Sequence, residues 1–172
     1  FLYDKKLSNF LPKTLEYKPS AHLLSSIVNI QTKRYDISDF SLESVWTNKK
    51  LDENQINKLN NFFWLFSLDL KSSNISVQKI VKNWIEINYR YNSKTWNFET
   101  TSKRIISWLS NYKLSYDNAS DQYKIDFNNI IQKQALHLLN QINKIKDYHK
   151  RLIGISAIIL TGLAYNDEKK LI

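Results

Sequence analysis

From Leu51 onward, apolar residues recur every three or four positions, which is the spacing of an amphipathic helix. We expect Asp52 to be the N-cap of the first helix and Thr100 or Thr101 that of the third, because short oxygen-bearing side chains accept hydrogen bonds from the free N–H groups of a first turn. The predicted helices cover residues 51–70, 74–85, 100–112, 120–142 and 148–164.

Residues 1–50 show no such periodicity, and both prolines of the chain, Pro12 and Pro19, fall among them. A short apolar run at Leu23–Ile30 is compatible with one short helix. We therefore expect an irregular, wrapping segment over 1–50 and a helical domain over 51–172.

The helix predicted over 148–164 is apolar on both faces and contains the only two glycines of the chain, Gly154 and Gly162. A glycine inside a helix costs ~1 kcal/mol relative to alanine. The pattern therefore predicts that neighbouring helices flank this one on both faces and approach its backbone closely.

A tryptophan followed by an aliphatic residue occurs three times, at Trp64-Leu65, Trp84-Ile85 and Trp108-Leu109. The spacings of 20 and 24 residues equal about one helix plus one loop. Such an echo is typical of stacked helical hairpins, as in an α/α toroid or a solenoid. We predict an all-α fold.

Composition excludes several classes of function. With two glycines the chain has no glycine-rich phosphate-binding loop, and an all-β fold would need more turn glycines. Cysteine is absent, which excludes disulfides, thiol nucleophiles and Cys-ligated zinc. The longest apolar stretch, Leu152–Tyr165, is shorter than the ~20 residues that cross a bilayer, so we expect no membrane partner.

The formal net charge is +9, from 25 Lys and Arg against 16 Asp and Glu. An excess of this size attracts polyanions such as nucleic acid, anionic polysaccharide or an acidic membrane. A solvated basic surface without a partner is an equally good interpretation.

No residue set predicts catalysis, a metal site or a cofactor. The three histidines, His22, His137 and His149, lie far apart and have no second ligand at helical spacing. Glu43, Asp52, Glu53 and Asp69 could include a pair for glycoside hydrolysis, but no spacing selects one.

Tryptophan and arginine supply the candidate binding residues. Trp46 and Trp96 lie in polar loops, where an indole either tucks under the loop or offers a flat face to a sugar ring or a base. Arg104 precedes Trp108 by one turn and could hold a carboxylate or sulfate, or form an ordinary ion pair. We take Trp96, Arg104 and Trp108 as substrate-binding candidates.

Several of these residues also occur, in order, in a known pattern: a Phe/Trp-Leu helix, a helix ending in Trp-Ile, a loop Trp, then Thr-x-x-Arg and Ile/Leu-x-x-Trp. Here the pattern is carried by Phe63-Trp64-Leu65, Trp84-Ile85, Trp96, Thr101, Arg104 and Trp108, with AIILTGLAY near the end. Over residues 20–172 the sequence resembles the N-terminal helical part of bacterial heparinase II/III-family proteins.

This resemblance implies an incomplete (α/α) toroid of antiparallel helical hairpins, truncated at its C-terminal end and followed in a whole protein by a β-sandwich domain. Family members with known activity are lyases that cleave uronic-acid-containing polysaccharides by β-elimination. Their Asn, His and Tyr catalytic residues have no counterpart here. The expected function is therefore to form part of the cleft for an anionic polysaccharide, without catalytic residues.

Two alternatives from other classes stay open: a basic helical nucleic-acid-binding module and a helical protein-interaction scaffold. Nucleic acid is the less favoured partner, because the basic residues are spread along the chain. Since the chain begins at Phe1 and stops at Leu171-Ile172 after a helix-like run, we expect a segment of a longer bacterial protein, periplasmic or cytoplasmic.

Overall fold

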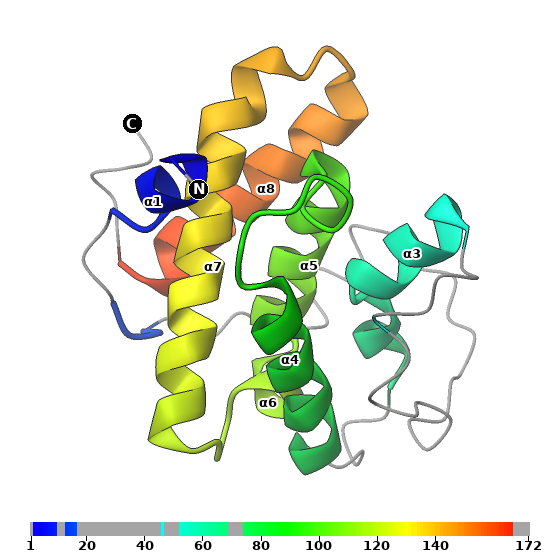
Figure 1. The fold of residues 1–172 in the computed structure, drawn as a ribbon. Coiled ribbons are helices and arrows are strands. Elements are labelled where there is room, and N and C mark those ends of the chain that lie inside the picture. The colour runs from blue at the N-terminus through cyan, green and yellow to red at the C-terminus, as the bar shows by residue number, and fades with distance from the viewer. Residues whose placement is uncertain (1, 10–12, 17–45, 47–51, 69–73, 167–172) are drawn as a thin grey trace.

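The computed structural model describes residues 2–9, 13–16, 46, 52–68 and 74–166 (Figure 1). Its elements are α1 (Leu2–Leu7), α3 (Glu53–Asn60), the 3₁₀ helix η2 (Phe63–Ser67), α4 (Asn74–Asn88), α5 (Phe98–Ser110), α6 (Tyr112–Ser115), α7 (Asp121–Gln141), the 3₁₀ helix η3 (Ile142–Lys144) and α8 (Tyr148–Ala164). Within these ranges there is no β-strand. The predicted all-α class is confirmed.

Helix α5 is the centre of the fold. Nearly all of its residues are buried, and α3, α7 and α8 pack around it. Its closest packing partner is α8, whereas α4 lies beside α7 (Figure 1). The chain reverses direction between α4 and α5 and again between α7 and α8 (Figure 1). Helices α7 and α8 pack on each other as a hairpin, whereas α4 packs mainly on α6 and α7.

The helix predicted over 51–70 is interrupted, and that prediction was wrong in extent. Asp52 is the N-cap as expected, and it forms a capping box with Gln55. However, α3 ends at Asn60, and Phe62 adopts a left-handed conformation with φ of 58°. The sequence after Asn60 is apolar on every side, so a continuous helix would expose aromatic rings; the break buries Phe62 together with Trp64 and Leu65.

The N-cap of α5 also differs from the prediction. It is Asn97, whose Oδ1 accepts a hydrogen bond from the N–H of Thr100 at 2.9 Å, and not Thr100 or Thr101. The two threonines are buried in the first turn. Asparagine and threonine are both common N-cap residues, so the sequence alone does not show at which of these positions the helix begins. Ser120, the predicted start of α7, is its N-cap.

The described part of the N-terminal segment packs on the helical body. Helix α1 occupies Leu2–Leu7, and Leu7 is fully buried. Further along, the N–H of Glu16 donates to the carbonyl of Ala164 at 2.7 Å. The run Leu23–Ile30 lies outside the described residues.

The three Trp-aliphatic pairs meet in the core. The rings of Trp84 and Trp108 lie edge-to-face with centroids 5.4 Å apart, and Phe62 contacts both rings. Trp64 packs on Phe62 at 5.3 Å. The repeated tryptophans are therefore the shared centre of α4, α5 and η2.

Among the described residues, helix α8 has neighbouring helices on one face only, whereas the sequence predicted neighbours on both. On the inner face, a Cβ at Gly154 would lie 2.2 Å from Cζ of Phe98, so the ring sits directly on the glycine. The outer face is exposed along the whole helix and carries large apolar side chains: Tyr148, Leu152, Ile155, Ile159 and Leu163. We refer to these residues as the α8 stripe. No charged residue occurs between Arg151 and Asn166.

None of the described helices is both long and apolar enough to cross a lipid bilayer.

Candidate functional site

The three predicted substrate-binding residues are all fully buried. Trp96 lies under its own loop: its Nε1 donates to the carbonyl of Asn88 at 2.9 Å. Trp108 lies between the ring of Trp84 and that of Phe127, which stacks on it at 5.4 Å. In this structure neither indole presents a face to solvent, so both act as core residues.

Arg104 is also buried, and its guanidinium lies over the ring of Trp84, 4.0 Å from the centroid. Its donors are directed to neutral acceptors: Gln134 Oε1, Thr101 Oγ1 and the carbonyls of Asn60 and Thr95. Among the described residues no carboxylate pairs with it. Burial lowers the pKa of the guanidinium well below its usual value.

The role of Arg104 follows from the two carbonyls that it binds. Nη1 donates to Asn60 O at 2.8 Å and to Thr95 O at 3.1 Å. Asn60 ends α3, whereas Thr95 lies in the loop between α4 and α5. Because one guanidinium holds both backbones, it fixes the separation of α3 and this loop.

A groove of about 920 Å³ lies between these two segments and the turn before α8. It is lined mainly by amides and charged side chains: Glu53, Asn54, Ile56, Asn57, Lys58, Asn61, Ser93, Lys94, Asn97, Phe98, Glu99, Thr100, Lys103, Ile145 and Lys150. We refer to it as the α3–α5 groove. In the sequence, no spacing or motif distinguishes the lysines and asparagines of this groove from other polar surface residues.

The wall of the groove is held by a small polar network. Asn57 Oδ1 accepts from Asn97 Nδ2 at 2.7 Å and from Thr100 Oγ1 at 3.1 Å. The network connects the middle of α3 to the first turn of α5. It orders amide groups along the groove, which are groups able to hydrogen-bond to sugar hydroxyls.

Positive charge prevails in the groove. Glu99 is paired with Lys103 at 2.5 Å and with Lys150 at 3.4 Å. Its burial raises the pKa of the carboxyl, but the two lysines outweigh burial and lower it, so Glu99 is ionised at neutral pH. Lys58 and Lys94 form no ion pair with any residue that the structure describes, and both are exposed.

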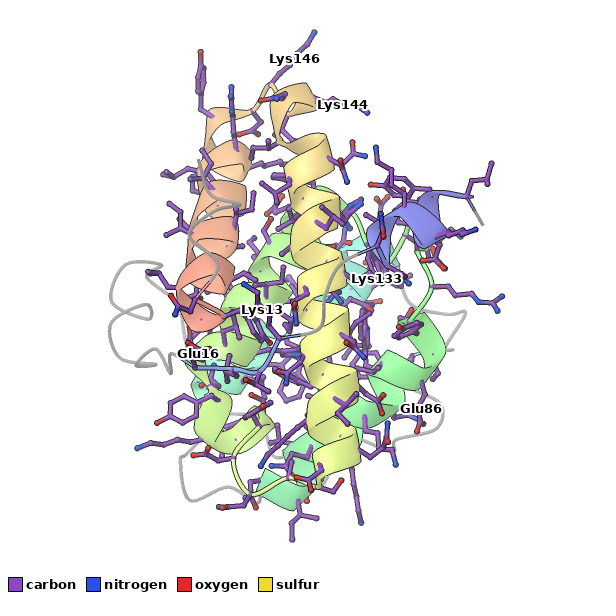
Figure 2. All side chains as sticks on the ribbon, turned by 90° about the vertical axis from the view of Figure 1, so that its left-hand side faces the viewer. Lys13, Glu16, Glu86, Lys133, Lys144 and Lys146 are labelled. Atoms are coloured by element: carbon purple, nitrogen blue, oxygen red, sulfur yellow. The ribbon has the colours of Figure 1, made fainter. Side chains whose placement is uncertain are left out.

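A second polar cluster lies on the other side of the 89–97 loop, where α1 meets α7. Lys133 Nζ forms an ion pair with Asp4 Oδ1 at 2.7 Å and donates to the carbonyl of Tyr89 at 2.9 Å. Figure 2 shows Lys133 on the face of α7 that is turned toward α1. His137, one turn further along α7, is hydrogen-bonded through Nδ1 to the hydroxyl of Tyr3 at 2.9 Å.

Burial and hydrogen bonding together set the pKa values of His137 and Asp4 in this cluster. Burial lowers the pKa of His137 to about 4, although a hydrogen bond with the backbone of Trp96 acts in the opposite direction. The imidazole is therefore neutral at neutral pH. For Asp4, burial raises the pKa, but the hydrogen bonds from Lys133 and from the Tyr91 N–H outweigh it and lower the pKa. Asp4 is therefore ionised at neutral pH.

The other sequence candidates that the structure describes do not assemble into a site. Among the described residues no three His, Cys, Asp or Glu side chains come together as metal ligands. Asp52 caps α3, and Glu53 lines the α3–α5 groove. Trp46 stacks on Phe62, with centroids 5.4 Å apart. His22, Glu43 and Asp69 lie outside the described residues.

No protein-family model matches the chain, and no curated protein or solved structure is significantly similar to it. The likeness to heparinase II/III-family proteins therefore stays a prediction from the sequence motifs.

Proposed function

We propose that this chain is the N-terminal helical portion of a heparinase II/III-like polysaccharide lyase and that it forms part of an incomplete (α/α) toroid. Two features support the ring. The chain reverses direction after α4 and after α7, with α4 beside α7 and α5 beside α8, which is the order of helices in successive hairpins of a toroid. The α8 stripe then offers the side of the last hairpin on which a further hairpin would pack.

The α3–α5 groove is the proposed contact surface for the polysaccharide, and its chemistry is the observation that carries the proposal. Asparagine amides suit sugar hydroxyls, and Lys58 and Lys94 supply charge for the carboxylate of a uronic acid. Both lysines are exposed and thus available to a ligand. In this proposal Arg104 positions the groove wall and does not contact the sugar.

β-Elimination itself is assigned to residues outside this helical portion. The described residues that line the groove include no histidine or tyrosine that could remove the C5 proton of a uronate. Within the lyase, the described helices would bind the acidic chain and hold it in register. The isolated chain is expected to bind heparan-type oligosaccharides weakly and to release no unsaturated uronate from them.

Binding of a heparan-type oligosaccharide, measured by titration calorimetry, tests this function. We expect the double variant Lys58→Gln/Lys94→Gln to bind about tenfold more weakly, a loss of about 1.4 kcal/mol. The matched control is Lys79→Gln/Lys113→Gln, which removes the same charge from exposed positions on α4 and α6. Equal loss in the two variants would show that the groove has no part in binding.

The same titration separates the polysaccharide from nucleic acid. With the groove as the binding site, heparin should compete better than single-stranded RNA or DNA at fixed ionic strength. If polyanions bind only to the positive charge distributed over the surface of the protein, heparin, RNA and DNA should compete about equally. Preference for nucleic acid would favour the basic helical module over the lyase portion.

A further inference from the structure

Helix α1 is attached to the helical body through the side chains of only a few of its residues. It has six residues, too few to be a stable helix by itself. Tyr3, Asp4 and Leu7 point into the body, whereas Leu2, Lys5 and Lys6 are exposed. Its docking therefore depends on what the body provides for these three side chains.

For Asp4 the body provides an anion site. One carboxylate oxygen, Oδ1, is bound by Lys133 Nζ at 2.7 Å and by the backbone N–H of Tyr91 at 3.0 Å. The Lys133 side chain is only 2% exposed, and Asp4 is the carboxylate paired with it among the described residues. A buried ammonium needs an anion, because an unpaired charge away from water is strongly unfavourable.

The site is fixed by contacts that do not involve α1. Lys133 Nζ also donates to Tyr89 O and lies 4.3 Å from the centre of the Tyr89 ring. The loop that carries the Tyr91 N–H is held by the Trp96 indole, which bonds to Asn88 O. Both donors to the carboxylate thus belong to the helical body and would keep their positions without α1.

Aromatic rings surround the anion site. Tyr3 inserts its ring beside Asp4, edge-to-face against Tyr91 at 5.0 Å and against His137 at 5.9 Å. Its hydroxyl reaches His137 Nδ1 at 2.9 Å and Gln141 Nε2 at 3.4 Å. The site thus accommodates a carboxylate next to a six-membered ring that carries a hydroxyl.

We propose that the Lys133 site is a binding site for the carboxylate of an acidic sugar, occupied in this structure by Asp4 and Tyr3 of the chain itself. A uronate combines the same two groups in one molecule, a carboxylate and a six-membered ring that carries hydroxyls. Such a ligand and α1 exclude one another. The choice of a uronate rests on the proposed function, whereas the carboxylate site rests on the geometry alone.

Chemical rescue tests the site. The variant Asp4→Ala leaves Lys133 without its carboxylate, and its thermal midpoint should fall by about 10 °C. Sodium glucuronate at 100 mM should raise that midpoint by about 3 °C, the shift produced by a ligand at a few times its Kd. Equal ionic strength of sodium chloride, and equal concentration of glucose, should give no rise.

Two comparisons complete the test. Wild type should show no glucuronate-dependent rise, because Asp4 fills the site, and Asp4→Ala/Lys133→Gln should show none, because the cation is gone. Absence of rescue in Asp4→Ala overturns the proposal and leaves the ion pair as a structural tether. Rescue by acetate without rescue by glucuronate overturns the sugar assignment and retains a carboxylate site.

If Asp4→Ala does not fold, the wild-type chain supplies a second measurement. Glucuronate should speed amide hydrogen exchange in α1 relative to glucose at the same concentration and to chloride at the same ionic strength. It binds only the small population in which α1 is undocked, so it raises that population without a measurable change in the thermal midpoint. Exchange in α5 should not change. Unaltered exchange throughout α1 contradicts the proposal. Lys58 and Lys94 are unchanged in these experiments, so the proposal for the Lys133 site and the proposal for the α3–α5 groove can be refuted independently.

Discussion

Arg104 joins α3 to the loop before α5 without the help of an acidic partner. Its planar fork supplies donors to four acceptors at once, which a single ammonium cannot do. We expect Arg104→Lys to keep the charge and still lower the free energy of unfolding by about 2–4 kcal/mol. Urea denaturation of the variant measures this loss.

The matched control is Arg90→Lys, the same exchange at an exposed position. It should change stability by less than about 0.5 kcal/mol. An Arg104→Lys protein as stable as wild type would mean that charge alone, and not the geometry of the fork, holds the groove wall.

The buried imidazole of His137 makes stability depend on pH. Its folded pKa of about 4 lies below the ordinary value of 6.5, so the unfolded chain binds the proton more tightly. Stability from this group is complete above pH 6.5 and is lost as the pH falls toward 4, by about 3 kcal/mol in all. Urea titrations from pH 7 to pH 4 should show this slope.

His137→Leu should remove this part of the slope while acidic groups still contribute near pH 4. His149→Gln, a change at an exposed position, should keep the slope of the wild type. If His137→Leu and wild type lose stability in parallel between pH 6.5 and 4.5, the imidazole is not the group responsible.

For single residues, the sequence indicated which side chains could bind a ligand by their chemistry, but it did not show whether they are buried or which residues they contact. From the sequence, the indole of Trp96 could lie under its loop or face the solvent. In the structure it lies under the loop, where its Nε1 donates a hydrogen bond to the carbonyl of Asn88. The Lys133–Asp4 pair joins residues that are 129 positions apart, and no local pattern connects them. Groove lysines such as Lys58 look like any other solvated lysine in the sequence.

At the element scale, the contact between α5 and α8 depends on one missing side chain. Gly154→Ala would normally stabilise a helix by up to ~1 kcal/mol, but here the new methyl group meets Phe98. We expect a net loss of about 1–3 kcal/mol in the free energy of unfolding. Urea denaturation measures the change.

A double-mutant cycle separates the clash from helix propensity. In the background of Phe98→Leu, where the ring is gone, Gly154→Ala should be neutral or stabilising. If Gly154→Ala destabilises both backgrounds equally, Phe98 is not what the glycine accommodates.

The existence of the helices was predictable because the 3.6-residue period persists through α4, α7 and α8, and α7 begins at the expected position. The break after α3 was not, because the all-apolar run that follows Asn60 satisfies a helical pattern in any register. A left-handed turn at Phe62 depends on the tertiary core that it fills, and that information is not local.

At the scale of the whole molecule, the positive charge of the α3–α5 groove and the exposed apolar face of α8 lie in different regions. Lys58 and Lys94 line the α3–α5 groove, whereas the α8 stripe contains no charge. A polyanion and a further helix would therefore not compete for the same surface. The all-α class followed from periodicity, but which helix faces stay open depends on how the hairpins pack.

Lysine substitutions at two neighbouring residues of α8 should have very different effects on stability, because only one of the two residues belongs to the exposed α8 stripe. Ile159 is 47% exposed and Ile158 only 8%. Ile159→Lys should leave the free energy of unfolding within about 0.5 kcal/mol of wild type, because no described neighbour covers the side chain. Ile158→Lys should cost more than about 3 kcal/mol, because it buries a charge against the core.

Dye binding supplies the second measurement on this face. Exposed apolar surface binds 8-anilinonaphthalene-1-sulfonate, so the folded wild-type chain should enhance its fluorescence, and Leu152→Lys/Ile159→Lys should reduce the enhancement by about half. The control Ile75→Lys/Ile125→Lys removes apolar side chains that are exposed on α4 and α7, outside the stripe. A control that lowers dye binding as much as the stripe variant would mean that the stripe is not a continuous apolar surface, and the toroid would lose the face on which its next hairpin packs.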